Sequence, residues 1–408
     1  MNILIVSPYL PLPLGGHGGS VYLYEMLKRL CTRHAVTLVS FADRDEMAMA
    51  KDLSPLALTT HIVPRRKGPS RSPGDALFLV VSRMLQMARS VLSWEPYYVS
   101  KFRSARMSRM IRRVTSDVQY DVVQIEYAQM GTYRGEVRSG KTIIHEIDVV
   151  FRTMLRYHRE ARSPLKRGAF FVEMCRWKRY EPAMAGRFDG VSTLTQPDRL
   201  MLQRMTGIRT IEVLPPGVET APVPAPIPAR EGGTLLFVGN LAQLPNADAA
   251  LWLCTEIFPR IAAEYPGAGL SIIGRGASPA LRAAATDPRI RILNFVEDLR
   301  PHFLHAGVFI APLRLGGGIK IKMLDALTHG CPVVTTPVGA EGITGLDASS
   351  VRISRTADGL ARHCVALLRD PARAAELGRQ GQAVVGENFS WDLIMQRTSA
   401  YYHSLLHS

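Results

Sequence analysis

A proline-rich segment in the middle of the chain constrains the fold more than any other feature of the sequence. Residues 214–233, LPPGVETAPVPAPIPAREGG, concentrate proline and glycine in a way that neither a helix nor a strand tolerates. On both sides of this segment, short apolar runs typical of strands alternate with segments of helical spacing. Such alternation predicts parallel, doubly wound sheets. We therefore expect an α/β protein with two Rossmann-like domains and a stiff connection between them.

The predicted elements can be placed by residue. Before the connection, we expect a helix at residues 22–30 and strands at residues 2–7, 35–41, 122–125 and 142–147. After it, we expect helices at residues 249–262 and 320–329 and strands at residues 234–238, 270–273, 290–293, 308–311 and 332–335. The domains are then residues 1–213 and 234–385, with residues 386–408 as a C-terminal helix that packs back across them. Two such domains are expected to face a central cleft, which suits a two-part substrate.

Composition and hydropathy exclude several classes of protein. The chain has 408 residues, 47% hydrophobic and 21% charged, as in ordinary globular proteins. The most apolar stretch, residues 76–94, is interrupted by Arg83, Gln86 and Arg89, so a transmembrane span is not expected. The first residues have no basic region before their apolar run, which predicts a buried strand and a cytoplasmic protein rather than a secretory signal. The five cysteines are far apart and form no CxxC pair, so we expect buried thiols and no zinc site.

The positive charge is concentrated in the first half of the chain. Of the net charge of +15, residues 1–190 contribute 30 basic and 17 acidic residues, against 20 and 18 in the remainder. Arg103, Arg106, Arg109 and Arg112 recur every third residue, which predicts a basic amphipathic helix, and residues 151–180 interleave arginines with aromatic residues. These blocks favour an anionic membrane surface or an acidic acceptor as a partner. The alternative is a solvated face in an arginine-rich protein, and no signature of a nucleic-acid-binding fold is present.

The most informative segment is APLRLGGGIKIKMLDALTHGCPVVTT, residues 311–336. A predicted strand runs into three glycines and then into a helix with Lys320 and Lys322 in its first turns, which is a geometry suited to phosphate. These are the only lysines after residue 179, where every other basic residue is arginine, so a compact ammonium is indicated at both positions. Asp325 lies on the same face and is expected to accept hydrogen bonds from sugar hydroxyls. The alternative is an ordinary loop and surface helix.

A second glycine-rich loop follows the first predicted strand. Residues 15–20, GGHGGS, match neither a Walker loop nor the GxGxxG fingerprint, since a lysine and a third suitably placed glycine are missing. Gly18 and Gly19 nevertheless precede a helix and bring backbone donors to a bound anion.

The segment PLRLGGGIKIKMLDALTHGCPVVTTPVGAEGI resembles the donor-binding motif of retaining GT-B glycosyltransferases, specifically glycosyltransferase family 4. The resemblance extends to FVGNLAQLPNADAALWL, SIIGRG, RIRILNFVEDLRPHF, LPPGVE and PYLPLPLGGHGG, and so covers most of the chain. It implies that the second domain holds a nucleotide diphosphate sugar and the first presents the acceptor. The implied donor-binding residues are Gly18, Gly19, Gly239, Arg275, Phe295, Val296, Gly316, Gly317, Gly318, Ile319 and Asp325.

The resemblance also implies roles and departures. Lys320 and Lys322 are expected beside the diphosphate as catalytic groups, and Phe295 and Val296 beside the base. The family motif has two glutamates; here Gly317 and Asp325 stand at those positions, so a sugar-hydroxyl contact is lost while a ribose contact remains possible. His145 is the candidate for the family's catalytic histidine, with a histidine satisfied inside the sheet as the alternative.

Two further positions are weighed for chemistry. An arginine that the family often has in the helix after the first glycine loop is replaced near Tyr22. Asp43 and Asp45 form a DxD pattern, but it lies in a helical-looking segment, so no metal is expected. Glu146 and Asp148 lie near His145 and are expected to orient it or the acceptor hydroxyl, or to cap a helix.

The predicted activity is transfer of a sugar, with retention, from a nucleotide diphosphate donor to an acceptor hydroxyl, in cell-surface polysaccharide or glycolipid synthesis. A UDP- or GDP-sugar is the expected donor, used without a cofactor, and a lipid-linked or anionic saccharide is the expected acceptor. The enzyme would be cytoplasmic and peripheral on the inner face of the plasma membrane. The alternatives are an inactive GT-B scaffold, a nucleotide-binding protein, a nucleotide-sugar epimerase and, least favoured, a nucleic-acid binder.

Overall fold

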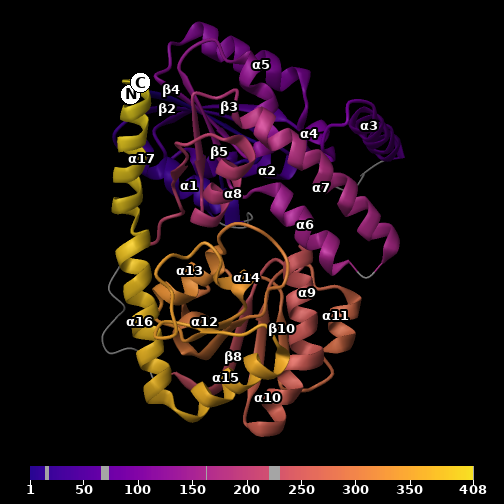
Figure 1. The fold of residues 1–408 in the computed structure, drawn as a ribbon, viewed down its shortest axis with the longest axis vertical. Helices are drawn as coiled ribbons and strands as arrows, with labels where there is room; N and C mark the ends of the chain where they lie inside the picture. Colours follow the sequence, from indigo (N-terminus) through magenta and orange to yellow (C-terminus); the bar gives the residue numbers. More distant parts are fainter. Residues whose placement is uncertain (14–17, 66–72, 162, 220–229, 408) are drawn as a thin grey trace. The chain divides into compact units, whose positions relative to one another are not determined.

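The computed structural model describes residues 1–13, 18–65, 73–161, 163–219 and 230–407. The chain divides into two compact units, one formed by Met1–Pro215 with Met395–Ser408 and the other by Pro216–Ile394 (Figure 1). Most of the predicted connection, residues 220–229, lies outside the described residues.

The first unit is built on a seven-stranded parallel sheet. Its strand order is β3-β2-β1-β4-β5-β6-β7, so the chain changes direction across the sheet between β1 and β4. The strands are β1 (Asn2–Ser7), β2 (Ala35–Ala42), β3 (Leu58–Pro64), β4 (Val122–Glu126), β5 (Lys141–Glu146), β6 (Gly190–Thr193) and β7 (Glu212–Val213). Ile3 pairs with Val36 on one side and with Val122 on the other. The central strands are buried on both faces because helices cover them, as their continuous apolar runs require.

The helices of this unit begin with α1 directly after the first glycine loop. They are α1 (Gly18–Leu30), α2 (Arg44–Ala48), η1 (Ala50–Leu53), α3 (Pro73–Leu92), α4 (Tyr97–Phe102), α5 (Ala105–Asp117), η2 (Ala128–Glu136), α6 (Val150–Glu160), α7 (Pro164–Ala185) and α8 (Gln196–Thr206). A buried core of apolar side chains from β1, β2, β4, β5 and the covering helices holds the unit together.

The second unit has a six-stranded parallel sheet with the order β10-β9-β8-β11-β12-β13. Its strands are β8 (Glu231–Val238), β9 (Gly269–Ile273), β10 (Ile290–Leu293), β11 (Ala306–Ala311), β12 (Val333–Thr335) and β13 (Arg352–Ile353). Numbered within the unit this is the 3-2-1-4-5-6 order of a dinucleotide-binding fold, and the strand order reverses between β8 and β11. Strand β8 begins three residues earlier than the sequence predicts.

Helices cover both faces of this second sheet. They are α9 (Leu244–Trp252), a π-helical turn η3 (Leu253–Ile257), α10 (Phe258–Glu264), α11 (Pro279–Ala284), α12 (Arg300–His305), α13 (Ile321–Thr328), α14 (Pro337–Ala340), α15 (Ala357–Arg369) and α16 (Pro371–Phe389). The single helix predicted at residues 249–262 is therefore a continuous run of three segments, with the π turn in the middle. Its buried face packs on β8 and β9 through Trp252, Phe258 and Ile261.

The last helix, α17 (Trp391–Leu406), returns to the first unit. Tyr402 Oη donates to Gln124 Oε1 at 2.7 Å, and Tyr401 Oη donates to the carbonyl of Val191 at 3.0 Å. Gly190 makes this contact possible, since a β-carbon there would lie 2.5 Å from Tyr401 Oη. The C-terminal helix is thus hydrogen-bonded to β4 and β6 of the first sheet.

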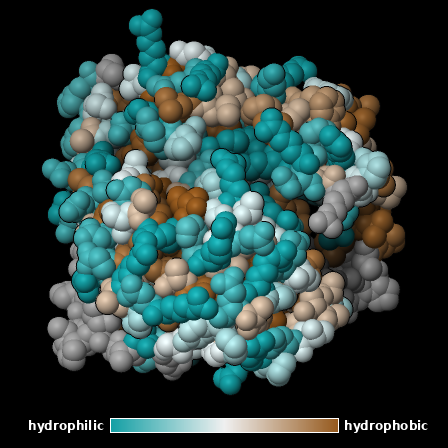
Figure 2. All heavy atoms as spheres, turned by 60° about the horizontal axis from the view of Figure 1, so that its bottom comes forward, coloured by the Kyte–Doolittle hydropathy of each residue, from teal (hydrophilic) through white to brown (hydrophobic). Residues whose placement is uncertain are grey.

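The surface and the cysteines complete the description. In Figure 2, which turns the bottom of Figure 1 forward, hydrophilic side chains predominate and apolar ones are scattered among them. Within the described ranges, no helix is both long enough and apolar enough to cross a bilayer. All five cysteines are free thiols; Cys254, Cys331 and Cys364 are buried as expected, whereas Cys31 and Cys175 are only partly buried, which corrects that prediction.

Candidate functional site

The candidate site of the second unit lies where β8 and β11 end. The strand order reverses between these two neighbours, so their following loops diverge and leave a crevice at the carboxyl edge of the sheet. Gly239 directly follows β8, and the three glycines follow β11. Gly239 N donates to the carbonyl of Ile273 at 2.9 Å, which holds the end of β8 against β9.

The glycine turn after β11 has a conformation that glycine favours. Gly316 has φ +99° and Gly318 has φ +60°, both in the left-handed region. Lys320 forms the N-cap of α13 and folds back over this turn, where Nζ donates to the carbonyls of Gly317 at 2.9 Å and Gly318 at 2.6 Å. The ammonium of Lys320 therefore lies on the glycine turn at the start of the helix, as the sequence predicts. The adjacent Ile319 is buried.

Lys322 lies in the first turn of α13, two residues after Lys320. Its ammonium donates to Asn246 Oδ1 and lies 4.9 Å from the centroid of the Phe237 ring. Burial, together with the nearby charge of Lys320, lowers the pKa of Lys322 to about 7. A β-carbon at Gly239 would lie 2.6 Å from Nζ, so the absence of a side chain there gives the lysine its space. An anionic ligand stabilises the charged form of this ammonium, which burial disfavours in the free protein.

Asn246 holds Lys322 in place and was missed in the sequence. It is buried in the first turns of α9, and its Nδ2 donates to the carbonyl of Asn240 at 2.9 Å while its Oδ1 accepts from the lysine. The amide orientation is thereby fixed at both ends. The available signal was an asparagine inside the mostly apolar helix LPNADAALW.

A second residue missed in the sequence fixes the loop after β11. Arg314 forms a bidentate ion pair with Asp248, with Nη2 to Oδ1 at 2.7 Å and Nε to Oδ2 at 3.0 Å. Its guanidinium also lies 4.5 Å from the Trp252 ring centroid. Both partners belong to α9, so the glycine turn and the helix that carries Asn246 are held together.

Asp325 is positioned to accept hydrogen bonds from the hydroxyl groups of a ligand. Burial raises the pKa of its carboxyl to about 7. The backbone carbonyl of Asp325 accepts from His329 Nδ1 at 2.7 Å, whereas its partly exposed carboxylate has no hydrogen-bond partner among the described residues. A carboxyl without a protein donor inside a crevice can pair with the hydroxyls of a ligand.

The remaining predicted residues of this unit lie along the same sheet edge. Arg275 follows β9 and Phe295 follows β10, and the guanidinium carbon lies 3.9 Å from the ring centroid. Phe295 is 48% exposed and Val296 is partly buried, so this stacked pair offers a planar, partly apolar surface. The loops after β8 and β9 lie very close together, since a β-carbon at Gly274 would collide with the carbonyl of Gly239.

The other predicted residues belong to the first unit. Gly18 and Gly19 open α1, while Gly15 and Gly16 lie outside the described residues. His145 is fully buried at the end of β5, where Nε2 lies 3.1 Å from Tyr22 Oη and Nδ1 lies 2.8 Å from Ser192 Oγ. Burial lowers the pKa of His145 to about 3. Both ring nitrogens therefore have protein partners, and the catalytic role of His145 stays a prediction.

A group of buried carboxylates surrounds the start of α6. Glu181 accepts from the backbone N–H groups of Val150 at 2.6 Å and Phe151 at 3.2 Å. Glu146 is fully buried, and within the part of the chain that the structure describes neither of its carboxyl oxygens has a hydrogen-bond partner; burial raises its pKa well above the ordinary value. Arg152 pairs with Asp198 at 2.6 Å in the same region. Glu146 does not contact the His145 ring by any hydrogen bond between the described residues.

The DxD pattern has a structural role in the part of the chain that is described. Asp43 is the N-cap of α2, where its carboxylate accepts from the N–H groups of Asp45 and Glu46, and Glu46 returns a bond to the Asp43 N–H. This reciprocal capping box accounts for the acidic residues of the segment. Among the residues described here, no group of three or more His, Cys, Asp or Glu residues has a metal-binding arrangement.

The predicted basic helix exists as α5, and its charges are partly paired. Met107, Ile111 and Val114 are buried on one face. Arg103 of the predicted pattern precedes α5 and pairs with Glu95, and Arg112 within α5 pairs with Glu136 at 2.6 Å. Part of the arginine pattern is therefore structural.

Residues 232–370 match the family model described as glycosyl transferases group 1. The match lies within the second unit. The matched residues include Gly239, Asn246, the glycine turn, both lysines and Asp325, so the crevice at the switch point lies in the matched region.

Curated relatives match part of the chain. The chain is 28% identical over 183 residues to the phosphatidyl-myo-inositol mannosyltransferase of Mycolicibacterium smegmatis, which is 43% of this chain and 46% of the relative. It is 30% identical over 154 residues to the GDP-mannose-dependent monoacylated alpha-(1-6)-phosphatidylinositol monomannoside mannosyltransferase of Corynebacterium glutamicum, 35% of this chain and 40% of the relative. The chain thus spans less than half the length of these relatives.

Solved structures extend the likeness to the fold of the whole chain. The crystal structure of Anabaena HepE in complex with UDP and glucose matches 99% of this chain and 100% of that chain, with a TM-score of 0.69 and 13% identity. At this identity the likeness concerns the fold. Two parallel-sheet units and the likeness to this structure over the whole chain confirm the predicted GT-B fold class.

Proposed function

We propose that this protein is a retaining glycosyltransferase of family 4 that moves a sugar from a nucleotide diphosphate to an acceptor hydroxyl. One observation carries the proposal: the ammonium groups of Lys320 and Lys322 lie at the glycine turn and the first turn of α13, at the switch point of the glycosyl transferases group 1 domain. Backbone donors, a helix N-terminus and two ammonium groups together suit a diphosphate.

The proposed chemistry breaks the bond between the anomeric carbon and the diphosphate oxygen, while the acceptor oxygen forms a new bond to the same carbon. Negative charge grows on the leaving diphosphate. Lys320 and Lys322 would stabilise that charge without solvent reorganisation, because Asn246 and the glycine carbonyls already hold their ammonium groups. The acceptor hydroxyl loses its proton when the new bond forms. In this scheme the nearest base is the diphosphate oxygen that leaves the anomeric carbon, and it takes up that proton. No metal ion takes part in the proposed reaction.

The proposed donor is a UDP- or GDP-sugar. The Anabaena HepE structure contains UDP, and the Corynebacterium relative is named as GDP-mannose-dependent, so both bases are supported by similar proteins. In this proposal the base lies beside Phe295 and Val296, the ribose hydroxyls contact Asp325, and Gly18 and Gly19 of the first unit contact the phosphates. Phe295 suits the base because its ring is half exposed and backed by Arg275.

The proposed acceptor is a lipid-linked or anionic saccharide in cell-surface polysaccharide or glycolipid synthesis. Two relatives named for phosphatidylinositol substrates support a glycolipid pathway. The basic excess of residues 1–190 supports an anionic acceptor and a cytoplasmic, peripheral position at the membrane.

Calorimetry with UDP, GDP, ADP and CMP tests the donor site. We expect selective binding of UDP or GDP, weakened at least about tenfold by Lys320→Ala or Lys322→Ala, since each removes a charge-assisted contact to phosphate. Arg362→Ala, an exposed charge on α15, is the matched control and should leave affinity unchanged. Binding of none of the nucleotides by folded protein would contradict the proposal.

An inactive GT-B scaffold is the second candidate, because Gly317 replaces a family glutamate and its carbonyl instead accepts from Lys320. Release of free nucleotide from a donor sugar separates the two. A transferase releases UDP or GDP in proportion to acceptor consumed, whereas a scaffold binds the nucleotide and releases none from the intact donor.

A further inference from the structure

Helix α3, Pro73–Leu92, presents large apolar side chains to solvent. Each of them is 45% exposed or more, and Leu92 at its end is 88% exposed. They are Leu77, Val80, Val81, Met84, Leu85, Met87, Val91 and Leu92. An isolated exposed leucine is ordinary on a protein surface, but eight such residues on one helix form a continuous patch.

These residues share one face of the helix. At 3.6 residues per turn, the spacing from Leu77 through Val81, Met84 and Leu85 to Leu92 keeps every member of the set within the same half of the helix surface. The opposite face carries polar residues that are turned inward; Ser82 and Gln86 are partly buried and Ser90 is buried. A surface helix of a soluble protein usually buries its apolar face and exposes its polar face, whereas α3 does the reverse.

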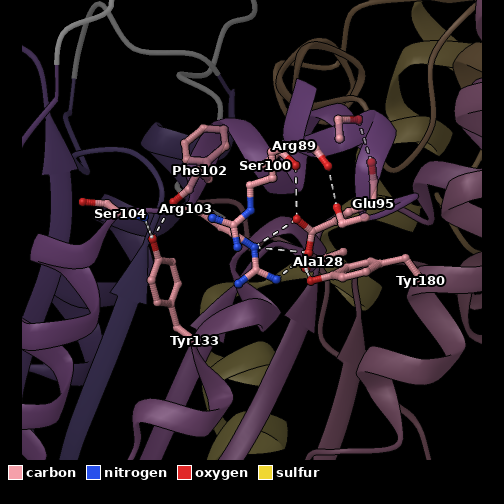
Figure 3. A network of polar contacts seen from close by, with 11 residues as sticks. Arg89, Glu95, Ser100, Phe102, Arg103, Ser104, Ala128, Tyr133 and Tyr180 are labelled. Atoms are coloured by element: carbon pink, nitrogen blue, oxygen red, sulfur yellow. Dashed lines mark hydrogen bonds and ion pairs between the residues drawn. The ribbon is translucent and has the colours of Figure 1, made fainter. Parts of the chain in front are cut away.

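Polar contacts fix the helix in this orientation. Ser90 Oγ donates to the carbonyl of Glu95 at 2.7 Å and accepts from Arg176 Nη1 at 3.0 Å. The Glu95 carboxylate in turn accepts from Ser100 Oγ at 3.1 Å and pairs with Arg103, as Figure 3 shows. The turn after α3 is therefore tied to α4, to the Arg103 that ends α4, and to α7. The exposed apolar face is a property of the folded unit.

Positive charges border the apolar face. Residues 77–92 contain Arg83 and Arg89 and no carboxylate. Both arginines are exposed, and on a helical projection they lie roughly 120° to either side of the centre of the apolar face. Trp94, just beyond the helix, is 45% exposed with the guanidinium of Arg176 at 5.1 Å from its ring. Arginines beside an apolar face and a tryptophan at its end are the pattern of a helix at a lipid interface.

We propose that α3 binds an anionic lipid surface, lying in the plane of the interface with its apolar face among the acyl chains and Arg83 and Arg89 at the level of the lipid phosphates. A second copy of the chain fits less well, because pairing two α3 faces would bring four arginines together with no carboxylate between residues 77 and 92 to offset them. The surface is separate from the crevice of the second unit, so it stands whether or not the proposed sugar transfer is correct.

Vesicle flotation of the full chain tests the proposal. We use vesicles of phosphatidylcholine with one third phosphatidylglycerol, and vesicles of phosphatidylcholine alone. The wild type should float with the anionic vesicles at low salt and much less with the neutral ones. Met84→Gln with Leu85→Gln should lower the partition coefficient about tenfold or more, because each side chain favours transfer to an apolar phase. Arg83→Gln with Arg89→Gln should lower it mainly for anionic vesicles.

The matched control changes two exposed apolar residues elsewhere in the same unit. Val118→Gln with Leu200→Gln should leave the partition coefficient unchanged; both residues are exposed but lie outside α3. Equal losses in this variant and in the α3 variant would overturn the proposal. Thermal unfolding of each variant shows that the fold is kept, as expected for exposed positions.

Tryptophan fluorescence reports where the protein meets the lipid. Trp94 is exposed, whereas Trp177, Trp252 and Trp391 are 1%, 6% and 6% exposed, so quenching by bromine on the acyl chains selects Trp94. Quenching on vesicle binding, lost in Trp94→Phe, supports an interfacial α3. Vesicle binding without quenching overturns it. A dimer that becomes a monomer in the Met84→Gln, Leu85→Gln variant, with no vesicle binding by the wild type, also overturns it and identifies a protein contact.

Discussion

Gly239 follows β8 and Lys322 lies in the first turn of α13, and the ammonium of the lysine occupies the place of a side chain at the glycine. A β-carbon at Gly239 would lie 2.6 Å from Nζ and 2.8 Å from Asn246 Cγ. The φ angle of Gly239 is not among those in the left-handed region, so the backbone conformation does not require glycine there. The lack of space for a side chain does. The crevice therefore depends on a missing side chain as well as on the groups that are present.

Gly239→Ala should displace Lys322 and weaken nucleotide binding. The added methyl group forces the ammonium or Asn246 to move, so we expect an affinity loss of about tenfold with little loss of stability. Calorimetry with the preferred nucleotide measures it. Gly232→Ala is the matched control, because Gly232 lies near the start of β8, the strand that Gly239 follows, and nothing lies within 4 Å of its added carbon. Equal affinity of the two variants would show that Lys322 does not contact the nucleotide.

Diphosphate binding should be coupled to proton uptake by Lys322. Because the pKa of this lysine in the free protein is lowered to about 7, much of it is neutral at pH 8, and a bound diphosphate favours the charged form. Affinity should therefore fall as pH rises above about 7. Calorimetry at pH 8 in two buffers of different ionisation enthalpy counts the protons taken up. The uptake should vanish in Lys322→Met and at pH 6, where the lysine is already charged.

The sequence predicts the site only as far as local patterns reach. Lys320 and Lys322 stand out because arginine is used everywhere else after residue 179, and the glycines mark the turn. Asn246 and Arg314 could not be found in this way. Asn246 is 76 residues from the lysine that it holds, and Arg314 is 66 residues from Asp248. Their roles follow from which loops the sheet order brings together.

The fold shows the same limit. Strands β1 and β4 are buried runs at the centre of the first sheet, and β1 and the edge strand β10 have the predicted bounds. The strands missed in the sequence are β3, β6, β7 and β13. Strand β3 has a mostly half-exposed LTTHIVP pattern because it lies at the edge of the sheet, and β7 and β13 have two residues each. Such short or half-exposed segments form strands only because a neighbouring strand is already in place.

Removal of divalent metal should leave activity unchanged. In the proposed mechanism the two lysines and the start of α13 carry the charge of the leaving diphosphate, so no metal is needed there. The measurement is the rate of nucleotide release from the donor sugar before and after dialysis against EDTA. A loss of rate that Mg²⁺ or Mn²⁺ restores would contradict the prediction.

Asp325→Asn should stabilise the protein and weaken donor binding. Burial raises the pKa of Asp325 from 3.8 to about 7, so the folded state binds the extra proton between these values and loses stability as pH rises through that window. An asparagine carries no charge and so avoids the free-energy cost of a buried carboxylate. We expect Asp325→Asn to be about 1–2 kcal/mol more stable than the wild type at pH 8 and to show no gain at pH 4. Urea unfolding at the two pH values measures it. A gain at pH 4 as large as at pH 8 would exclude the carboxylate charge as the cause.

His145 should remain neutral throughout the working pH range. Its pKa is lowered to about 3 from 6.5, so the folded state binds fewer protons than the unfolded chain between these values, and stability should fall as pH drops below about 6.5. His145→Asn should remove that dependence, and His145→Ala should cost about 2–4 kcal/mol because the hydroxyls of Tyr22 and Ser192 lose their buried partner.

The rate of transfer should show no inflection near pH 6.5. An inflection there that His145→Asn abolishes would instead mean that the ring exchanges a proton during the reaction.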